Sequence, residues 1–232
     1  WYSVIDLKDA FWACPLDKDS RDLFAFEQED PEMGRKQQLR WTVLPQEFTE
    51  SPNLFGQTLE KLLQGWEIPE NIKLLQYVDD LLVAGREEEE TRSATIQLLN
   101  FLGENGLKVS RSNLQFVEQE VNYLGHWLSK GKKKLDPDRV SGMLALRAPQ
   151  SKKEVRQLLG LLGYCRSWIE AYSEKVKFLY EKLTLDNNSK WSPEDDERLE
   201  EIKRMLIEAP VSNLPDVDKP FDLFVSTSNQ TA

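Results

Sequence analysis

Cysteine and histidine are scarce in this chain of 232 residues, which contains two Cys and one His. Cys14 and Cys165 are too few and too far apart for a disulfide framework or a cysteine-rich zinc site. No apolar run approaches the roughly 18 residues of a transmembrane helix, and no signal-peptide pattern opens the chain. We therefore expect an intracellular, cytoplasmic protein without a membrane partner.

The chain also lacks the excess of basic residues that is typical of nucleic-acid-binding proteins. Its 30 Lys and Arg stand against 40 Asp and Glu, for a net charge of -10. Contact with phosphates depends on the local field rather than on the sum, and basic residues gather in Arg35–Arg40, Lys130–Lys134 and Lys152–Arg156. The acidic balance therefore argues against a nucleic-acid partner without excluding one.

What the chain does have is an ordinary globular composition, 40% hydrophobic and 30% charged. This is enough for one large domain or two smaller ones with a core. The sequence begins at Trp1 rather than at Met, inside a strand-like pattern, and ends abruptly at Ala232. We expect a fragment of a longer polypeptide.

The stretch Leu74–Ala84 places two adjacent carboxylates, Asp79 and Asp80, between two apolar runs. This pattern predicts a β-hairpin with an acidic turn. One interpretation is structural, because Asp is common in turns, where it bonds to its own backbone. The other is a metal site, since like charges brought together where water is scarce raise a pKa or demand a cation such as Mg²⁺.

A third carboxylate is needed for a metal site, because adjacent side chains on a strand point to opposite faces. Asp6 is the candidate, since it interrupts the apolar, strand-like run Trp1–Phe11 where a buried strand would carry a hydrophobe. If the two strands adjoin, Asp6, Asp79 and Asp80 can together hold a hard divalent cation.

Strand and helix patterns alternate along the first 135 residues and predict an α+β fold, an antiparallel sheet with helices on one face. A polar turn is expected at Asp17–Ser20. The expected strands are Leu23–Phe26, Gln38–Val43 and a hairpin over Val117–Leu135. The expected helices are 52–65, capped by Ser51 with Pro52 at its start, and Glu87–Glu104, which Asn105–Gly106 ends.

The C-terminal part is predicted to be helical. Leu135–Pro149 suggests a connector with a short helix, and Ser151–Glu154 is a capping box before an apolar stripe formed by Val155, Leu158, Leu159 and Leu162. A second capped helix is expected from Ser192 to Glu208, with Leu199, Ile202 and Leu206 facing inward. A proline-punctuated linker, Pro210–Pro220, and a strand beginning at Phe221–Val225 follow.

One face of the first of these helices carries Arg156, Gly160 and Gly163 at helical spacing. Glycine costs about 1 kcal/mol of helix stability, so two on one face suggest that something approaches the backbone closely. The sequence does not identify the partner of this face, and another helix of the protein is one candidate.

Four segments carry a resemblance to a known family. Ile5–Phe11, Leu44–Phe48, Tyr77–Asp80 and Tyr123–Gly125 occur in the order and rough spacing of retroviral reverse transcriptases, and the chain looks most like the gammaretroviral type, including endogenous copies. The resemblance implies a right-hand polymerase fold. Its expected parts are 1–18 for the first palm strand, 19–44 for a partial fingers hairpin, 45–135 for the palm, 136–209 for the thumb, and 210–232 for a linker and the start of a connection domain.

The resemblance implies an RNA-directed DNA polymerase in which Asp6 and Asp79 bridge two Mg²⁺ or Mn²⁺ ions and Asp80 supports the site. The implied partners are an RNA/DNA template-primer duplex and deoxynucleoside triphosphates, in the cytoplasm or in a virion. These residues do not encode the oligomeric state, or whether a parent polypeptide also carries ribonuclease H.

The resemblance also implies contact residues. Phe11 resembles a steric gate against a ribose 2′-hydroxyl, although its spacing equally fits a core aromatic, and Gln46 and Leu7 would lie at the nucleotide. The residues implied at the primer and template are Tyr77, Val78, Tyr123, Leu124, Gly125, Arg156, Gly160 and Gly163. His126 adjoins this set, and we expect it to be a solvent-facing hairpin residue.

Three departures from the family pattern bear on activity. Glu47 stands where the family usually has glycine, and its charge repels a triphosphate. Within Lys108–Asn113 the family typically has a lysine that protonates pyrophosphate; Arg111, Ser112 and Asn113 leave only Lys108. The N-terminal fingers are missing. A decayed or domesticated remnant that keeps the fold is therefore the alternative function, and an α+β interaction domain with an incidental acidic turn is a third.

Overall fold

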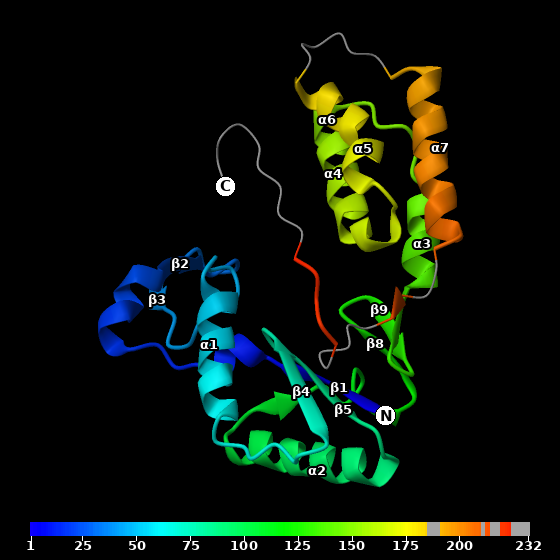
Figure 1. The fold of residues 1–232 in the computed structure, drawn as a ribbon. Coiled ribbons are helices and arrows are strands. Elements are labelled where there is room, and N and C mark those ends of the chain that lie inside the picture. Colours follow the sequence, from blue (N-terminus) through cyan, green and yellow to red (C-terminus); the bar gives the residue numbers. More distant parts are fainter. Residues whose placement is uncertain (185–190, 210–211, 214–218, 224–232) are drawn as a thin grey trace. The chain divides into compact units, whose positions relative to one another are not determined.

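The computed structural model describes residues 1–184, 191–209, 212–213 and 219–223. The chain divides into two compact units, Trp1–Leu124 and Gly125–Ala232, whose elements are labelled in Figure 1. The predicted boundaries of palm, fingers and thumb stay predictions. Among the described residues, no helix has the length and apolar character that crossing a membrane requires.

A five-stranded antiparallel sheet forms the centre of the first unit. Four strands lie in the order β4-β5-β1-β6, and β7 pairs with the beginning of β1. The strands are β1 (Tyr2–Lys8), β4 (Ile72–Tyr77), β5 (Asp80–Gly85), β6 (Lys108–Val109) and β7 (Gln115–Glu118), and β8 (Glu120–Tyr123) follows. The central position of β1 places the predicted Asp6 strand directly beside the predicted acidic hairpin.

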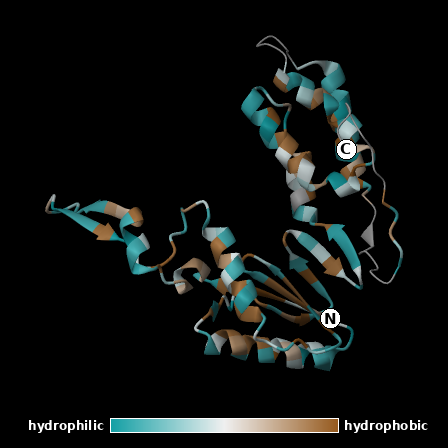
Figure 2. Ribbon diagram, turned by 60° about the vertical axis from the view of Figure 1, so that its left-hand side comes forward, coloured by the Kyte–Doolittle hydropathy of each residue, from teal (hydrophilic) through white to brown (hydrophobic). Residues whose placement is uncertain are grey.

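Two helices, α1 (Ser51–Leu63) and α2 (Glu88–Glu104), cover one face of this sheet. Side chains alternate across a strand, so Ile5 and Leu7 of β1 point to the same face, where both are buried with apolar residues of α1 and α2. In Figure 2 the central strands are largely brown, whereas the helices carry both teal and brown residues. The predicted α+β architecture, with helices on one face, is confirmed.

The ends of the two helices follow the predicted signals with one difference. Glu50 rather than Ser51 is the N-cap residue of α1, because Ser51 is already helical and its buried hydroxyl donates to the Pro45 carbonyl. Acidic residues fill the first turn of α2, where they complement the helix dipole. After α2, Gly106 adopts a positive φ of 77°, which ends the helix as expected.

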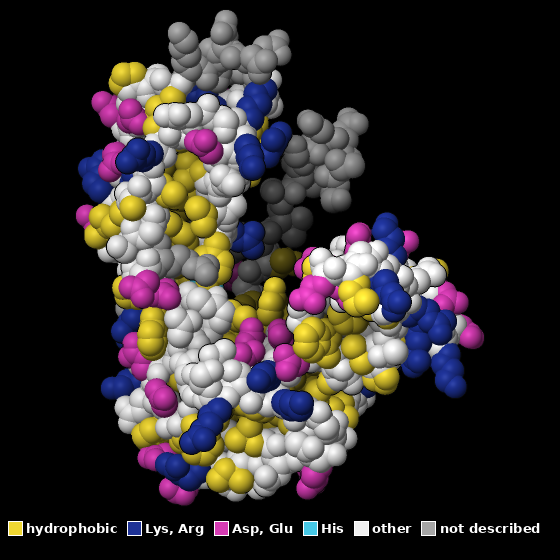
Figure 3. Space-filling model, turned by 180° about the vertical axis from the view of Figure 1, so that it is seen from behind, with side chains coloured by type: hydrophobic (Ala, Val, Ile, Leu, Met, Phe, Trp, Pro, Cys, Tyr) yellow, Lys and Arg dark blue, Asp and Glu magenta, His cyan; other side chains and the backbone are white. Residues whose placement is uncertain are grey.

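A two-stranded hairpin, β2 (Ala25–Glu29) and β3 (Lys36–Arg40), extends the first unit and is preceded by two 3-10 helices, η1 (Ala10–Ala13) and η2 (Lys18–Phe24). The strand predicted at Leu23–Phe26 is wrong in its first half, because the η2 helix, whose N-cap side chain Asp17 accepts from a backbone N–H, runs through Phe24. Both strands are largely exposed, and Lys and Arg gather over the hairpin in Figure 3.

The second unit combines a small sheet with a helical core. Its strands are β9 (His126–Ser129), β10 (Lys132–Leu135) and β11 (Ser212–Asn213), and its helices are α3 (Pro137–Leu144), α4 (Lys152–Tyr164), η3 (Arg166–Trp168), α5 (Tyr172–Lys175), α6 (Lys177–Thr184) and α7 (Pro193–Ile207). The predicted stripes of α4 and α7 are buried together in one cluster. Ser151 and Ser192 cap α4 and α7 as predicted. The capping box predicted at Ser151–Glu154 is incomplete, because the Glu154 carboxylate accepts from the Gln150 N–H instead of the Ser151 N–H.

Three further strand predictions are wrong in part. The strand predicted at Gln38–Val43 is β3, which ends at Arg40. The run Val117–Leu128 does not form a continuous arm, because Val117 and Leu124 adopt positive φ angles of 54° and 52° that interrupt it. The strand predicted from Phe221 is absent over Phe221–Leu223, and Phe224–Val225 lie outside the described residues.

Candidate active site

The register of the central strands brings Asp6 and Asp80 together. The two residues are direct cross-strand partners on β1 and β5, and Tyr77 of β4 is the partner of Asp80 on its other side. Directly opposed residues share a face of the sheet, so Tyr77, Asp80 and Asp6 form one row across three strands. This row lies on the face opposite Ile5 and Leu7, away from the helix-covered core.

Asp79 occupies the turn between β4 and β5, next to this row. Its backbone carbonyl accepts a hydrogen bond from the backbone N–H of Leu7 at 3.1 Å, which fastens the turn to β1. Asp79 and Asp80 follow Asp6 by 73 and 74 positions in the sequence. Strand pairing nevertheless brings all three residues to one end of three adjacent strands. The strand of Asp6 and the acidic hairpin are therefore neighbours, as a shared site for the three carboxylates requires.

The turn itself is strained and held by a side chain. Val78 has a φ of 53°, which is uncommon for a β-branched residue. The amide of Gln76 donates to the Val78 carbonyl at 3.2 Å and to the Gly56 carbonyl of α1 at 2.9 Å. Gln76 was not among the predicted site residues. The sequence signal for Gln76 is its polar side chain on the face of β4 that also carries Ile72 and Leu74, because alternate residues of a strand share a face.

Burial and neighbouring negative charge raise the pKa values of Asp79 and Asp80. Burial raises the pKa of Asp80, and the charges of Asp79 and Asp6 raise it further. Burial likewise raises the pKa of Asp79 and Asp6 adds to this, while a backbone hydrogen bond acts in the opposite direction. Burial and the charge of Asp80 raise the pKa of Tyr123 to about 12. Tyr123, predicted as a primer contact, therefore lies within electrostatic reach of the acidic row.

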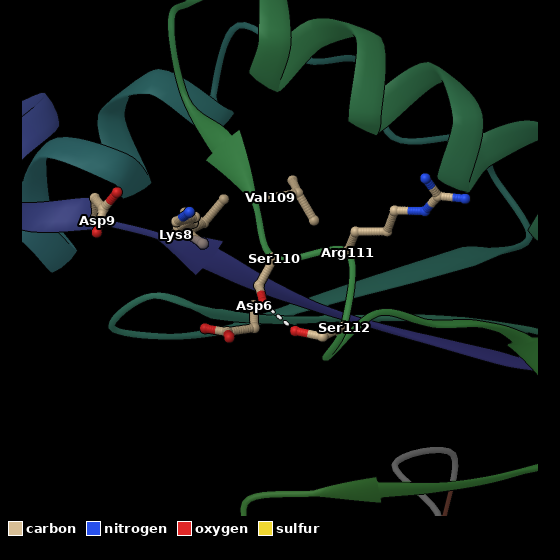
Figure 4. A pocket seen from close by; sticks show the side chains of 8 residues that line it. Asp6, Lys8, Asp9, Val109, Ser110, Arg111 and Ser112 are labelled. Atoms are coloured by element: carbon tan, nitrogen blue, oxygen red, sulfur yellow. Dashed lines mark hydrogen bonds between the residues drawn. The ribbon is translucent and has the colours of Figure 1, made fainter.

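Asp6 is engaged on its other side, toward β6 and β7. Its carboxylate accepts a hydrogen bond from the Asn113 side-chain amide at 2.7 Å, and its backbone carbonyl accepts one from the Ser110 N–H at 2.9 Å. An open pocket of about 900 Å³ adjoins it. Lys8, Asp9, Arg111 and Ser112 also line this pocket, as Figure 4 shows. No sequence signal predicts the contact of Asn113 with Asp6, because the two residues are 107 positions apart.

The chemistry of these donors suits a hard divalent cation. Carboxylate oxygens are the ligands that Mg²⁺ takes in proteins. Burial and neighbouring negative charge oppose the ionisation of Asp79 and Asp80, and a bound cation would stabilise their ionised forms. Across the described residues, however, no three His, Cys, Asp or Glu side chains come close enough together to hold an ion. The donor types fit such an ion, and the side chains of Asp6, Asp79 and Asp80 are not gathered into a ligand set.

The residues predicted at the nucleotide have different environments. Phe11 is half-buried and packs edge-on against Phe55, with ring centroids 5.7 Å apart, so it is both a core neighbour and a partly open ring. The Leu7 side chain is 3% exposed in the core. Gln46 and Glu47 are both exposed. The Glu47 side chain therefore lies in the same solvent-facing segment as Gln46.

The residues predicted at the primer combine exposure with unusual backbone. Tyr77 is 59% exposed beside Asp80, and Leu124 is 38% exposed. Leu124 and Gly125 both have positive φ angles, of 52° and 73°. Exposed side chains and tight turns are features of contact surfaces rather than of core.

On α4, Gly160 has open space where a Cβ would lie, and a Cβ on Gly163 would meet only the Tyr172 hydroxyl at 3.5 Å. Close packing by another described helix therefore does not explain Gly160. Arg156, on the same face, is exposed.

The expectation for His126 is wrong. Its ring stacks with the rings of Tyr164 and Trp168, with centroid distances of 4.7 and 5.3 Å. The imidazole Nδ1 and the Tyr164 hydroxyl also form a hydrogen bond of 2.7 Å. The imidazole is therefore half-buried in the second unit instead of facing solvent.

An antiparallel sheet with helices on one face and a cross-strand row of carboxylates on the other defines the palm of a right-hand nucleic-acid polymerase. Residues 1–128 match the family described as reverse transcriptase (RNA-dependent DNA polymerase). This chain belongs to the reverse transcriptase family.

The similar curated proteins are retroviral. The chain is 42% identical over 234 residues to the Gag-Pol polyprotein of Avian reticuloendotheliosis virus, covering 100% of the chain and 20% of that polyprotein. It is 42% identical over 227 residues to the Gag-Pol polyprotein of Baboon endogenous virus (strain M7), covering 97% and 13%. The Pol polyprotein of Feline endogenous virus ECE1 is also 42% identical, with 97% and 22% covered. The chain thus spans less than a quarter of each relative.

Solved structures agree with this assignment. The foamy viral protease-reverse transcriptase dRH in complex with double-stranded DNA is 32% identical with a TM-score of 0.81, covering 93% of this chain and 36% of that chain. The foamy viral protease-reverse transcriptase in complex with RNA/DNA hybrid is 32% identical with a TM-score of 0.77, covering 92% and 28%. The predicted right-hand polymerase fold and retroviral relationship are confirmed.

Proposed function

We propose that this chain carries the polymerase site of an RNA-directed DNA polymerase, which extends a DNA primer on an RNA or DNA template by two-metal-ion nucleotidyl transfer. The observation that carries the proposal is the strand register that sets Asp6 opposite Asp80 with Asp79 in the adjoining turn. Such convergence from distant segments is unnecessary for an incidental acidic turn. It is what a shared cation site requires.

Asp6, Asp79 and Asp80 are the side chains that would hold Mg²⁺ or Mn²⁺. Two such ions supply activation of the primer 3′-hydroxyl and neutralisation of charge on the leaving pyrophosphate. The remaining contribution of the protein is to position the reactants, which accounts for much of the barrier reduction in phosphoryl-type transfers. The strained Val78 turn, tied to α1 through Gln76, would hold Asp79 in place for this task.

The nucleotide and the primer are assigned to neighbouring residues. Phe11, supported by Phe55, would stand under the incoming sugar and exclude a ribose 2′-hydroxyl, and Gln46 and the Leu7 segment would complete the nucleotide site. Tyr77 and Val78 would contact the primer end, together with the turn formed by Tyr123, Leu124 and Gly125.

Duplex binding is assigned to α4 of the second unit. The open space at Gly160 would admit a nucleic-acid backbone or groove, with the exposed Arg156 beside it. Residues 125–184 contain 13 Lys and Arg against 6 Asp and Glu, so the local balance there is basic although the whole chain is acidic. The similar foamy viral enzymes were solved with double-stranded DNA and with RNA/DNA hybrid, which supports this class of partner.

A remnant without catalysis is the second candidate, and Glu47 favours it. An exposed carboxylate beside Gln46 repels a triphosphate unless it swings away. Such a protein would keep the fold and duplex binding but would not extend a primer.

Primer extension with Mg²⁺ or Mn²⁺ tests the two candidates, comparing the chain, Glu47→Gly and Asp79→Asn on an RNA template. We expect Glu47→Gly to extend the primer faster than the chain itself, and Asp79→Asn to abolish extension. Glu50→Gly is the control, because it removes an exposed carboxylate of the same loop. Hybrid binding without extension in both the chain and Glu47→Gly would establish the remnant.

A further inference from the structure

We propose that Asn113 is a latch on the Asp6 carboxylate, which holds it away from Asp79 and Asp80 until a divalent cation displaces the amide. The proposal rests on the metal site of the proposed function. It adds a positioning residue and a rearrangement that accompanies ion binding.

The geometry of β1 gives the latch its direction. One edge of β1 pairs with β5, which brings Asp80 opposite Asp6, and the other edge pairs with β6. Asn113 follows β6, and its amide nitrogen lies 2.7 Å from Oδ2 of Asp6. The hydrogen bond therefore draws the carboxylate toward the β6 edge and away from the acidic turn.

The amide is fixed by a chain of hydroxyls. The Ser112 hydroxyl donates to Oδ1 of Asn113 at 3.2 Å, and the Ser110 and Ser112 hydroxyls lie 3.3 Å apart. Figure 4 shows the link between these two serines next to Asp6. Because Oδ1 accepts from Ser112, the amide N–H groups face Asp6, and the backbone of Asn113 is tied to the Ser110 carbonyl at 3.3 Å.

This arrangement explains why the three carboxylates are neighbours without forming a ligand set. Asp6 is the cross-strand partner of Asp80, and Asp79 lies in the adjoining turn, yet no three acidic side chains of the described residues are gathered closely enough for an ion. The Asn113 amide is neutral, so it satisfies an oxygen of Asp6 without cancelling its charge. A cation that binds Asp79 and Asp80 still attracts Asp6 and competes with the amide for it.

Mn²⁺ binding to the whole chain, measured from the electron paramagnetic resonance signal of the free ion, tests the latch. We expect Asn113→Ala to bind Mn²⁺ about three- to tenfold more tightly, which is the net contribution of one typical hydrogen bond that no longer has to be broken. Asn53→Ala is the matched control, because Asn53 also donates an exposed amide to a carboxylate, that of Glu50. It should leave Mn²⁺ affinity unchanged.

A second readout follows the amide itself. During a Mg²⁺ titration, the side-chain NH₂ signals of Asn113 in ¹H–¹⁵N spectra should move as the bond to Asp6 is released, while those of Asn53 should not. Stationary Asn113 signals at saturating Mg²⁺ would overturn the latch.

The outcomes separate the latch from the metal site. Unchanged or weaker Mn²⁺ binding in Asn113→Ala, with binding lost in Asp79→Asn, would overturn the latch and leave the metal site standing. Absence of Mn²⁺ binding in the chain and in Asn113→Ala alike would overturn both.

Discussion

The two units handle buried carboxylates in opposite ways. In the first unit, Asp79 and Asp80 lie beside Asp6, and burial with mutual repulsion raises the pKa values of both. In the second unit, burial of Asp195 also opposes ionisation, but hydrogen bonds from Lys182 and Ser192 outweigh it and lower the pKa of Asp195. The buried carboxylate of Asp195 is thus neutralised by a basic residue of the same chain, Lys182.

The contrast extends to the net charge. Residues 1–124 contain 12 Lys and Arg against 23 Asp and Glu, whereas residues 125–232 contain 18 against 17. The acidic first unit holds Asp79 and Asp80, which have no basic partner in the described residues. The balanced second unit holds Asp195, which is paired with Lys182. A bound cation stabilises carboxylates most where no basic residue of the protein compensates their negative charge.

Breaking the pair in the second unit should have the largest effect. The Lys182 ammonium lies 2.7 Å from the Asp195 carboxylate, whose side chain is 6% exposed. Lys182→Ala strands this buried charge, and we expect a loss of about 3–5 kcal/mol in the free energy of unfolding, measured by urea denaturation at pH 7. Because the pKa of Asp195 is lowered, its stabilisation is present above the ordinary Asp pKa and is lost as pH falls.

The control for this prediction is Arg198→Ala, which removes an exposed partner of Glu194 from α7. An exposed pair contributes about 0–1 kcal/mol. Equal losses in the two variants would contradict the distinction between a buried and an exposed pair.

Glycines offer a second comparison of the two units. Gly85 of β5 is required by internal packing, because a Cβ there would lie 2.3 Å from Oγ1 of Thr91 and 2.8 Å from Cδ1 of Ile72. Gly85→Ala should cost about 1–3 kcal/mol through overpacking, measured by thermal and urea unfolding. Gly103→Ala on α2, where nothing lies within 4 Å, should instead stabilise the protein by up to about 1 kcal/mol.

Gly160 should behave differently from both. With nothing within 4 Å of its missing Cβ, Gly160→Ala should raise the free energy of unfolding by up to about 1 kcal/mol yet weaken binding to an RNA/DNA hybrid, measured by fluorescence anisotropy. Gly142→Ala, on α3 and equally open, should stabilise the protein without changing the affinity. If both variants bind the hybrid as the chain does, α4 is not the duplex contact.

The smallest effect concerns pH. A raised pKa means that the folded state binds the proton of Asp80 more tightly than the unfolded state, so this residue lowers stability as pH rises from the ordinary Asp pKa of about 3.9. Asp80→Asn should therefore unfold at a higher urea concentration than the chain at pH 7, with the difference vanishing below pH about 4.

Local signals predicted most of the elements correctly. The serine caps of α4 and α7, the acidic first turn of α2 and the stop at Gly106 are properties of neighbouring residues, and they form where the sequence places them. Prediction was wrong where backbone conformation departed from the residue preference, at Val117 and Leu124 with their positive φ angles, and where a 3-10 helix replaced a strand at Leu23–Phe24.

The sequence by itself determined that three carboxylates sit in apolar, strand-forming segments, because hydrophobic periodicity and turn chemistry are local and short-range. The tertiary structure alone decided that Asp6 faces Asp80, that Gln76 holds the Val78 turn, and that Asn113 bonds to Asp6. Such pairs depend on strand order and register, which arise from burying one face of the sheet under two helices rather than from any adjacent residues.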